Sequence, residues 1–173
     1  MFRVFLYLVL FFSFSLSLAQ NGVVRFDPSR TDDCYRLISS RNLSAAHLLE
    51  PKGRYVHTWH YQTPEKATSD FSGFGMAWHY AEMLPNGNLI AIIKDEMIIE
   101  LDWHSNLVWK AKLKAHHDFA RTQENHTIVV SRQDRPNPWQ PGQTLAIDEL
   151  VEFDASGNIV WTWNYIDHKA KLE

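Results

Sequence analysis

The chain contains very little cysteine: Cys34 is the only one among its 173 residues. A lone cysteine cannot close an intrachain disulfide, so an exported form of this chain would have to hold its fold together by packing. We expect the Cys34 thiol to be a buried structural group.

Basic charge is also in short supply. The 17 lysines and arginines are outnumbered by 20 acidic residues, which gives a formal net charge of −3. Such a chain has no positive field to attract a polyanion, so no nucleic-acid partner is expected.

Long apolar runs are absent except at the N-terminus. There, Arg3 precedes an apolar run from Val4 to about Leu18, and Ser17 and Ala19 are the small residues that a signal peptidase accepts. The pattern predicts a signal peptide over residues 1–19, a domain over residues 20–173, and a secreted or periplasmic location. A retained anchor is the alternative, but the run is short against the roughly 20 residues of a membrane span. No later segment is apolar enough to cross a membrane.

Sustained helical periodicity is missing as well, and a strand-and-turn segment recurs in its place. Each copy has an acidic residue, then a turn containing glycine or Ser-Asn, then an apolar and aromatic strand. A 52-residue spacing of such units is typical of β-propeller blades, in which aromatic rings fill the space between stacked sheets. The copies are Glu50–Trp59, Asp102–Ala111 and Asp154–Trp163.

Two hairpins are predicted between these copies. Tyr80–Leu84 and Leu89–Ile93 flank Asn-Gly, and Gly87 readily adopts the positive φ angle of a tight turn. The second hairpin follows 38 residues later and ends in Thr127–Ser131. Its Asn125 stands where Gly87 stood, and asparagine tolerates the left-handed conformation well.

The other segments are less regular. Tyr35–Ile38 and Tyr55–Tyr61 are predicted strands, whereas Ser39–Leu49 could be a short helix or a strand. Gln62–Gly75 is predicted as a polar loop. The proline-rich stretch Arg132–Gly142 is predicted as a long loop inserted into a blade.

These patterns together predict an all-β fold, specifically a partial β-propeller of about three blades. A closed ring generally needs about four to eight blades. We therefore expect either a fragment of a longer protein or closure by self-association of exposed sheet edges. An independent small β domain is the remaining alternative.

The densest group of polar residues is His116-His117-Asp118, at the predicted start of an inner strand. His79 aligns with His117 one hairpin earlier. Imidazole can act as base, acid or nucleophile near neutral pH, so His117 and His116 are the candidate catalytic residues, and Asp118 and His79 the candidate substrate-binding residues. The alternative is structural: one histidine packs against a tryptophan and Asp118 caps the turn.

Arg132 is the candidate anion-binding residue, because guanidinium donors match sulfate, phosphate or carboxylate oxygens. A solvated loop arginine is the alternative, and His104 is predicted at the surface. No metal and no cofactor are predicted, since His116 and His117 would point to opposite faces of a regular strand. Two glycosylation sequons start at Asn42 and Asn125.

Several stretches in order resemble the arylsulfotransferases, a family of exported six-bladed propellers. The resemblance covers nearly all of the mature chain. The stretches are Gly22–Pro28, Ala81–Leu89, Glu100–Trp109, His116–Phe119 and Asp148–Trp163.

The resemblance implies that a channel histidine passes a sulfuryl group from an aryl sulfate to a phenol. His117 matches the family's channel histidine in this blade, its neighbour His116 is the second candidate for that position, and Arg132 matches the family's arginine loosely. The family's His-x-Asn block and nucleophilic histidine are expected in later blades, and nothing after Trp163 supplies them. The chain is thus expected to hold part of a site. The alternative function is a non-catalytic, secreted propeller that serves as a binding module.

Overall fold

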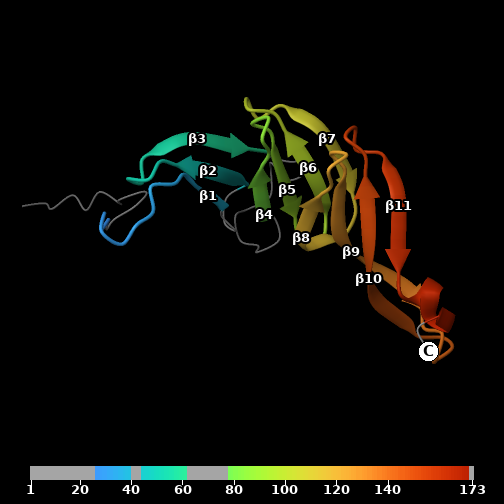
Figure 1. Ribbon diagram of the computed structural model, residues 1–173. Helices are drawn as coiled ribbons and strands as arrows, with labels where there is room; N and C mark the ends of the chain where they lie inside the picture. The colour runs from blue at the N-terminus through green and yellow to red at the C-terminus, as the bar shows by residue number, and fades with distance from the viewer. Residues whose placement is uncertain (1–25, 40–43, 62–77, 172–173) are drawn as a thin grey trace, which may run out of the picture.

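The computed structural model describes residues 26–39, 44–61 and 78–171. The described chain is all-β, as predicted, and forms three antiparallel sheets that follow one another along the sequence (Figure 1). No closed ring is found among these residues. The predicted signal peptide, the Asn42 sequon and the predicted loop over residues 62–75 lie outside them.

The first sheet has three strands and the other two have four each. The sequence left Ser39–Leu49 open between a helix and a strand, and the end of this segment forms strand β2. The first sheet contains β1 (Arg36–Ser39), β2 (Ala45–Leu49) and β3 (Tyr55–His60). The middle sheet contains β4 (Trp78–Met83), β5 (Leu89–Ile93), β6 (Met97–Leu101) and β7 (Leu107–Lys112). The third contains β8 (Ala115–Arg121), β9 (Thr127–Pro136), β10 (Thr144–Phe153) and β11 (Ile159–Asn164), and a 3-10 helix, η2 (Ile166–Lys171), follows it.

Both predicted hairpins are confirmed. β4 pairs with β5 and β8 pairs with β9, each antiparallel. Gly87 has φ of 85° and Asn125 has φ of 62°, so both turns use the left-handed conformation that these residue types tolerate. Asn125 is exposed in its turn.

The predicted long loop over residues 132–142 is wrong. β9 continues through Arg132 to Pro136, and β10 begins at Thr144, so the extra residues mostly lengthen a hairpin. The ladder is unbroken from Thr144 opposite Pro136 to Phe153 opposite Thr127. Pro136 is tolerated because it lies at the end of the ladder.

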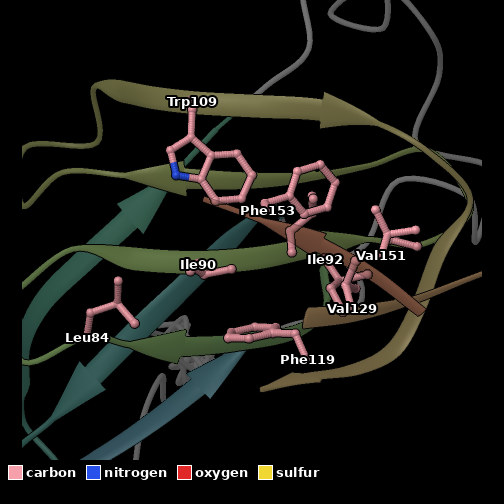
Figure 2. Packing of buried hydrophobic residues seen from close by; sticks show 10 residues of the cluster. Leu84, Ile90, Ile92, Trp109, Phe119, Val129, Val151 and Phe153 are labelled. Atoms are coloured by element: carbon pink, nitrogen blue, oxygen red, sulfur yellow. The ribbon is translucent and has the colours of Figure 1, made fainter. Parts of the chain in front are cut away.

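The core lies in two layers, one on each face of the middle sheet. Every residue of β5 and β6 is buried. Because side chains alternate along a strand, Leu89 and Ile99 pack with the first sheet's Trp59, whereas Ile90 and Ile98 pack with the third sheet. Full burial of one such aliphatic side chain stabilises the fold by about 1.5–3 kcal/mol. Figure 2 shows the second layer, where Trp109 and Phe153 lie together above Ile90 and Ile92.

The three sheets share a β-bulge just before the turn that leads to their last strand. The register shifts at Leu48/Leu49, at Glu100/Leu101 and at Glu152/Phe153. Since a bulge bends and twists a strand, each sheet bends in the same place.

A buried carboxylate lies beside the bulge of the middle sheet. Glu100 accepts hydrogen bonds from Asn88 Nδ2 at 2.6 Å and from Trp109 Nε1 at 2.7 Å. Buried polar groups need such partners, so the three side chains fix the relative positions of β5, β6 and β7.

The expectation of a buried cysteine is wrong, because Cys34 is exposed. It lies in the irregular segment before β1, where no sheet covers it. Within the described residues, no helix is long and apolar enough to span a membrane.

Candidate functional site

Two bulges in neighbouring sheets position the candidate histidines. In β4 the register with β5 shifts at His79. In β8 the register with β9 shifts between the paired residues Ala115 and Phe119, and residues 116–118 lie between these two. Bulges turn side chains away from the regular alternation of a strand and are frequent next to functional sites.

The bulges bring His79 and His117 together across the two sheets. The His117 backbone N–H donates to His79 Nδ1 at 3.1 Å, and the ring centroids are 5.5 Å apart. Because Nδ1 accepts, the neutral His79 ring must carry its proton on Nε2.

His116 is held by a carboxylate from β10. Its side chain is buried, and Nε2 lies 3.2 Å from Asp148 Oδ1. An ionised carboxylate only accepts, so Nε2 is the protonated nitrogen. The other ring nitrogen, Nδ1, is buried and has no hydrogen-bond partner among the described residues. The Asp-His pair thus orients a lone pair that no described residue uses.

His116 and His117 do not alternate as neighbours in a regular strand would. His117 has φ of 61°, and the two rings approach edge to face with centroids 4.7 Å apart. The prediction that they face opposite sides is wrong, because the bulge replaces regular β geometry at this point. His116 is buried and His117 is exposed, so His117 is the one that can meet a solute.

Asp118 belongs to the same bulge. Its Oδ1 accepts the backbone N–H of Phe119 at 2.8 Å, which is the local capping role weighed from the sequence. Asp118 also contributes to the raised pKa of Tyr80, for which burial is the largest cause and Glu82 adds a further contribution. Tyr80 therefore keeps its hydroxyl proton at neutral pH. Its ring packs edge-on against Phe119.

Arg132 lies in β9 directly opposite Asp148 of β10. Cross-strand partners project from the same face of a sheet, so its exposed side chain is a neighbour of the carboxylate that holds His116. The Arg132 backbone N–H donates to the Lys114 carbonyl at 2.9 Å, which ties this point of β9 to the start of β8.

The sequence did not single out Asp148 as a site residue. It lies 32 positions from His116, and only the cross-strand register could have revealed the contact. His104 is exposed, as predicted. Among the described residues, no three His, Cys, Asp or Glu side chains are grouped so that they could hold a metal ion.

The fold and this cluster together define a class: an all-β protein with stacked antiparallel sheets whose bulged first strands, β4 and β8, carry histidines. A family model described as arylsulfotransferase (ASST) matches residues 51–170. The match spans the middle and third sheets, including every candidate site residue. The chain belongs to the arylsulfotransferase family. No curated protein matches it.

Proposed function

We propose that this chain binds the sulfuryl group of an aryl sulfate at the histidine cluster and takes part in its transfer to a phenol. The observation that carries the proposal is the contact between His79 and His117, because it joins two sheets through side chains suited to an anion. Family membership supplies the reaction class. The sheets are then three blades of a propeller, and the cluster lies where their first strands meet.

The net reaction moves one SO3 unit. The S–O bond to the donor's aryl oxygen breaks, a new S–O bond forms to the acceptor's oxygen, and the acceptor's hydroxyl proton ends on the released phenol. Charge develops on the sulfuryl oxygens and on the leaving oxygen. Donors fixed in advance toward those atoms stabilise the transition state most.

His79 and His117 are assigned to the sulfuryl oxygens. His79 accepts the His117 backbone N–H at Nδ1, and this bond holds the two residues side by side across the two sheets. The exposed His117 ring is the second contact, and it polarises the group that is transferred. Asp118 holds the bulge in shape through its bond to the Phe119 backbone.

His116 and Arg132 are assigned to charge. Arg132 is opposite Asp148 in the ladder, and Asp148 is bonded to His116, so one carboxylate lies between two groups that can bear positive charge. In this arrangement Arg132 contacts a sulfuryl oxygen as a fixed cation. His116 supports His117 through their ring contact.

The test measures binding and turnover of para-nitrophenyl sulfate with phenol as acceptor. We expect His117→Ala to weaken binding of the sulfate ester about tenfold or more, the scale of one lost hydrogen bond to a charged group. Where the chain turns over, the rate should fall roughly a hundredfold, as for loss of one oxyanion donor.

His104→Ala is the matched control, because His104 is an exposed histidine in the turn between β6 and β7. It should bind and react like the unchanged chain. Full binding and turnover in His117→Ala would refute the assignment. If the ester binds at the cluster but no transfer occurs under any condition, the site is a binding module.

A further inference from the structure

Trp161 is exposed on one face of the third sheet, although its counterpart in the middle sheet, Trp109, is buried. Trp161 of β11 is 43% exposed, whereas Trp109 of β7 is 6% exposed. Both stand opposite the glutamate of the repeated bulge, Trp109 opposite Glu100 and Trp161 opposite Glu152. The two tryptophans therefore occupy equivalent positions in successive sheets.

The cover over Trp109 comes from the next sheet. Its ring stacks on Phe153, with centroids 5.7 Å apart and an interplanar angle of 25° (Figure 2). Gly157, in the turn after β10, lies so close that an added Cβ would be 2.8 Å from the indole ring. The burial of Trp109 thus depends on a large apolar side chain at the bulge of the third sheet and on a glycine in the turn after that bulge.

The junction between the first and middle sheets is built in the same way with different residues. His57 of β3 stacks on Trp103, in the turn of the middle sheet, with centroids 3.8 Å apart. Here too an aromatic ring of a sheet's last strand is covered by the turn of the next sheet. Ser105 of that turn accepts the His60 backbone N–H at 3.2 Å, which fastens the two sheets.

The first sheet carries a recess at the same place in its own turn. Its volume is about 210 Å³, and Leu49, Pro51 and Gly53 line it together with Ile38. Phe26 and Thr31, in the segment before β1, also line it. Leu49 follows the bulge as Phe153 does. Gly53 has φ of 86° and donates its N–H to Glu50, just as Gly157 has φ of 82° and donates to Asp154.

The recess faces away from the middle sheet. Arg36 and Leu49 are cross-strand partners that line it, whereas the alternating residues Leu37 and Leu48 pack with the middle sheet. Its volume is below the range of about 300–1,000 Å³ that is usual for small-molecule pockets. A single aromatic side chain suits it better than a whole ligand.

The carboxylate beside Trp161 is already arranged as it is beside Trp109. Glu152 Oε1 is 2.8 Å from His126 Nδ1, where Glu100 bonds to Asn88 in the middle sheet. Glu152 can therefore also accept a bond from the Trp161 indole N–H, as Glu100 does from Trp109. The exposed face of the third sheet also presents the half-buried Ile128, Val130 and Leu150.

We propose that two copies of this chain associate head to tail, with Trp161 of each copy inserted into the Leu49–Gly53 recess of the other. The contact would resemble the sheet-to-sheet interfaces inside the chain. In each case, an aromatic ring on the last strand of one sheet packs against the bulge and turn of the next sheet. The first and third sheets lie at opposite ends of the row (Figure 1). Because each copy provides one tryptophan and one recess, two reciprocal contacts close the assembly at the dimer.

The test is the mass of the chain in solution by sedimentation equilibrium. The unchanged chain should be a dimer, and Trp161→Ala should raise the dimer dissociation constant at least about thirtyfold, as for loss of a central aromatic anchor. Ile38→Asp, at the exposed rim of the recess, should have the same effect. Trp139→Ala is the control, because Trp139 is equally exposed but lies beyond β9, and it should leave the dimer unchanged.

Mixing the two weakened variants separates head-to-tail association from other modes. Trp161→Ala keeps its recess and Ile38→Asp keeps its tryptophan, so the mixture should form a heterodimer more tightly than either variant forms a homodimer. A monomeric unchanged chain would overturn the proposal. So would a dimer that Trp161→Ala breaks and Ile38→Asp does not, because that result would mean third sheet against third sheet. Far-UV circular dichroism must show that each variant is folded.

Discussion

His117 and His116 show how one irregular point in a strand can separate two roles between adjacent residues. The bulge leaves His117 exposed with its backbone N–H on His79, and it buries His116 against Asp148. A regular strand would have placed one imidazole on each face, with no contact between their rings. The positive φ of 61° at His117 is uncommon for a residue other than glycine, and it is found where the candidate chemistry lies.

Gly157 allows a residue-scale test of sheet packing. Gly157→Ala would place a methyl group 2.8 Å from the Trp109 ring at a φ of 82°. We expect it to lower the free energy of unfolding by about 1–2 kcal/mol through backbone strain and by about 1–3 kcal/mol more through overpacking. Urea denaturation followed by tryptophan fluorescence measures both contributions together.

Gly142→Ala is the matched control for that substitution. Gly142 has a nearly equal φ of 86°, but an added Cβ there meets nothing within 4 Å. It should therefore show only the strain. Equal losses in the two variants would mean that Trp109 moves aside at no cost, and the close approach would then not matter for stability.

The sequence pattern identified most of the strands because local chemistry determines them. Asn-Gly and Asn125 supply positive φ at the two predicted turns, and alternating apolar residues define the strands around them. The long β9–β10 hairpin was missed for the opposite reason. Its three nearby prolines are typical of loops, yet Pro136 falls at the last rung of the ladder, where its missing N–H costs little.

The candidate site was only half visible in the sequence. The adjacent histidines stood out by composition, whereas their geometry depends on a two-sheet contact and a bulge that no periodicity encodes. Asp148 illustrates the limit: it bonds to His116 only because β9 and β10 pair in one particular register.

At the scale of an element, the turns before the last strands of the middle and third sheets contain the same carboxylate cap. Asp102 accepts from the Asn106 side chain and backbone, and Asp154 does so from Asn158. The side-chain bond is the largest cause that lowers the pKa of each aspartate below the ordinary 3.8, and the backbone bond comes second.

These lowered pKa values predict a loss of stability in acid. A carboxyl whose pKa is lower in the folded state stabilises the fold above the unfolded value of 3.8, and that contribution disappears as the pH falls through the folded value. The double variant Asp102→Asn, Asp154→Asn should therefore lose less stability than the unchanged chain when acidified below pH 3.8. Thermal melts at neutral and acid pH measure the difference.

Asp33→Asn is the control for that comparison, because Asp33 is exposed and lies before the first strand. It should keep the acid response of the unchanged chain. If the double variant shows the same acid response as well, the turn carboxylates do not contribute to it.

At the scale of the whole molecule, the sheets differ in how many of their faces are covered. β5 and β6 are buried throughout, because the middle sheet has a neighbour on each side. In β9 and β10, buried residues alternate with exposed or half-buried ones. The backbone ladders are of one kind, antiparallel and internal to a four-stranded sheet, so differences in their opening should reflect side-chain burial.

Amide hydrogen exchange should therefore be slowest in β5 and β6. Their opening exposes two apolar faces, so it should require nearly the full free energy of unfolding, whereas β9 and β10 can open at a lower cost. The comparison should be made in the Trp161→Ala variant, because the outer face of the third sheet is not covered by a second copy in that variant. Equal protection of β9–β10 and β5–β6 in that variant would show that the three sheets unfold as one unit. Protection of β9 and β10 that rises with concentration in the unchanged chain, and not in the variant, would tie their stability to the head-to-tail contact.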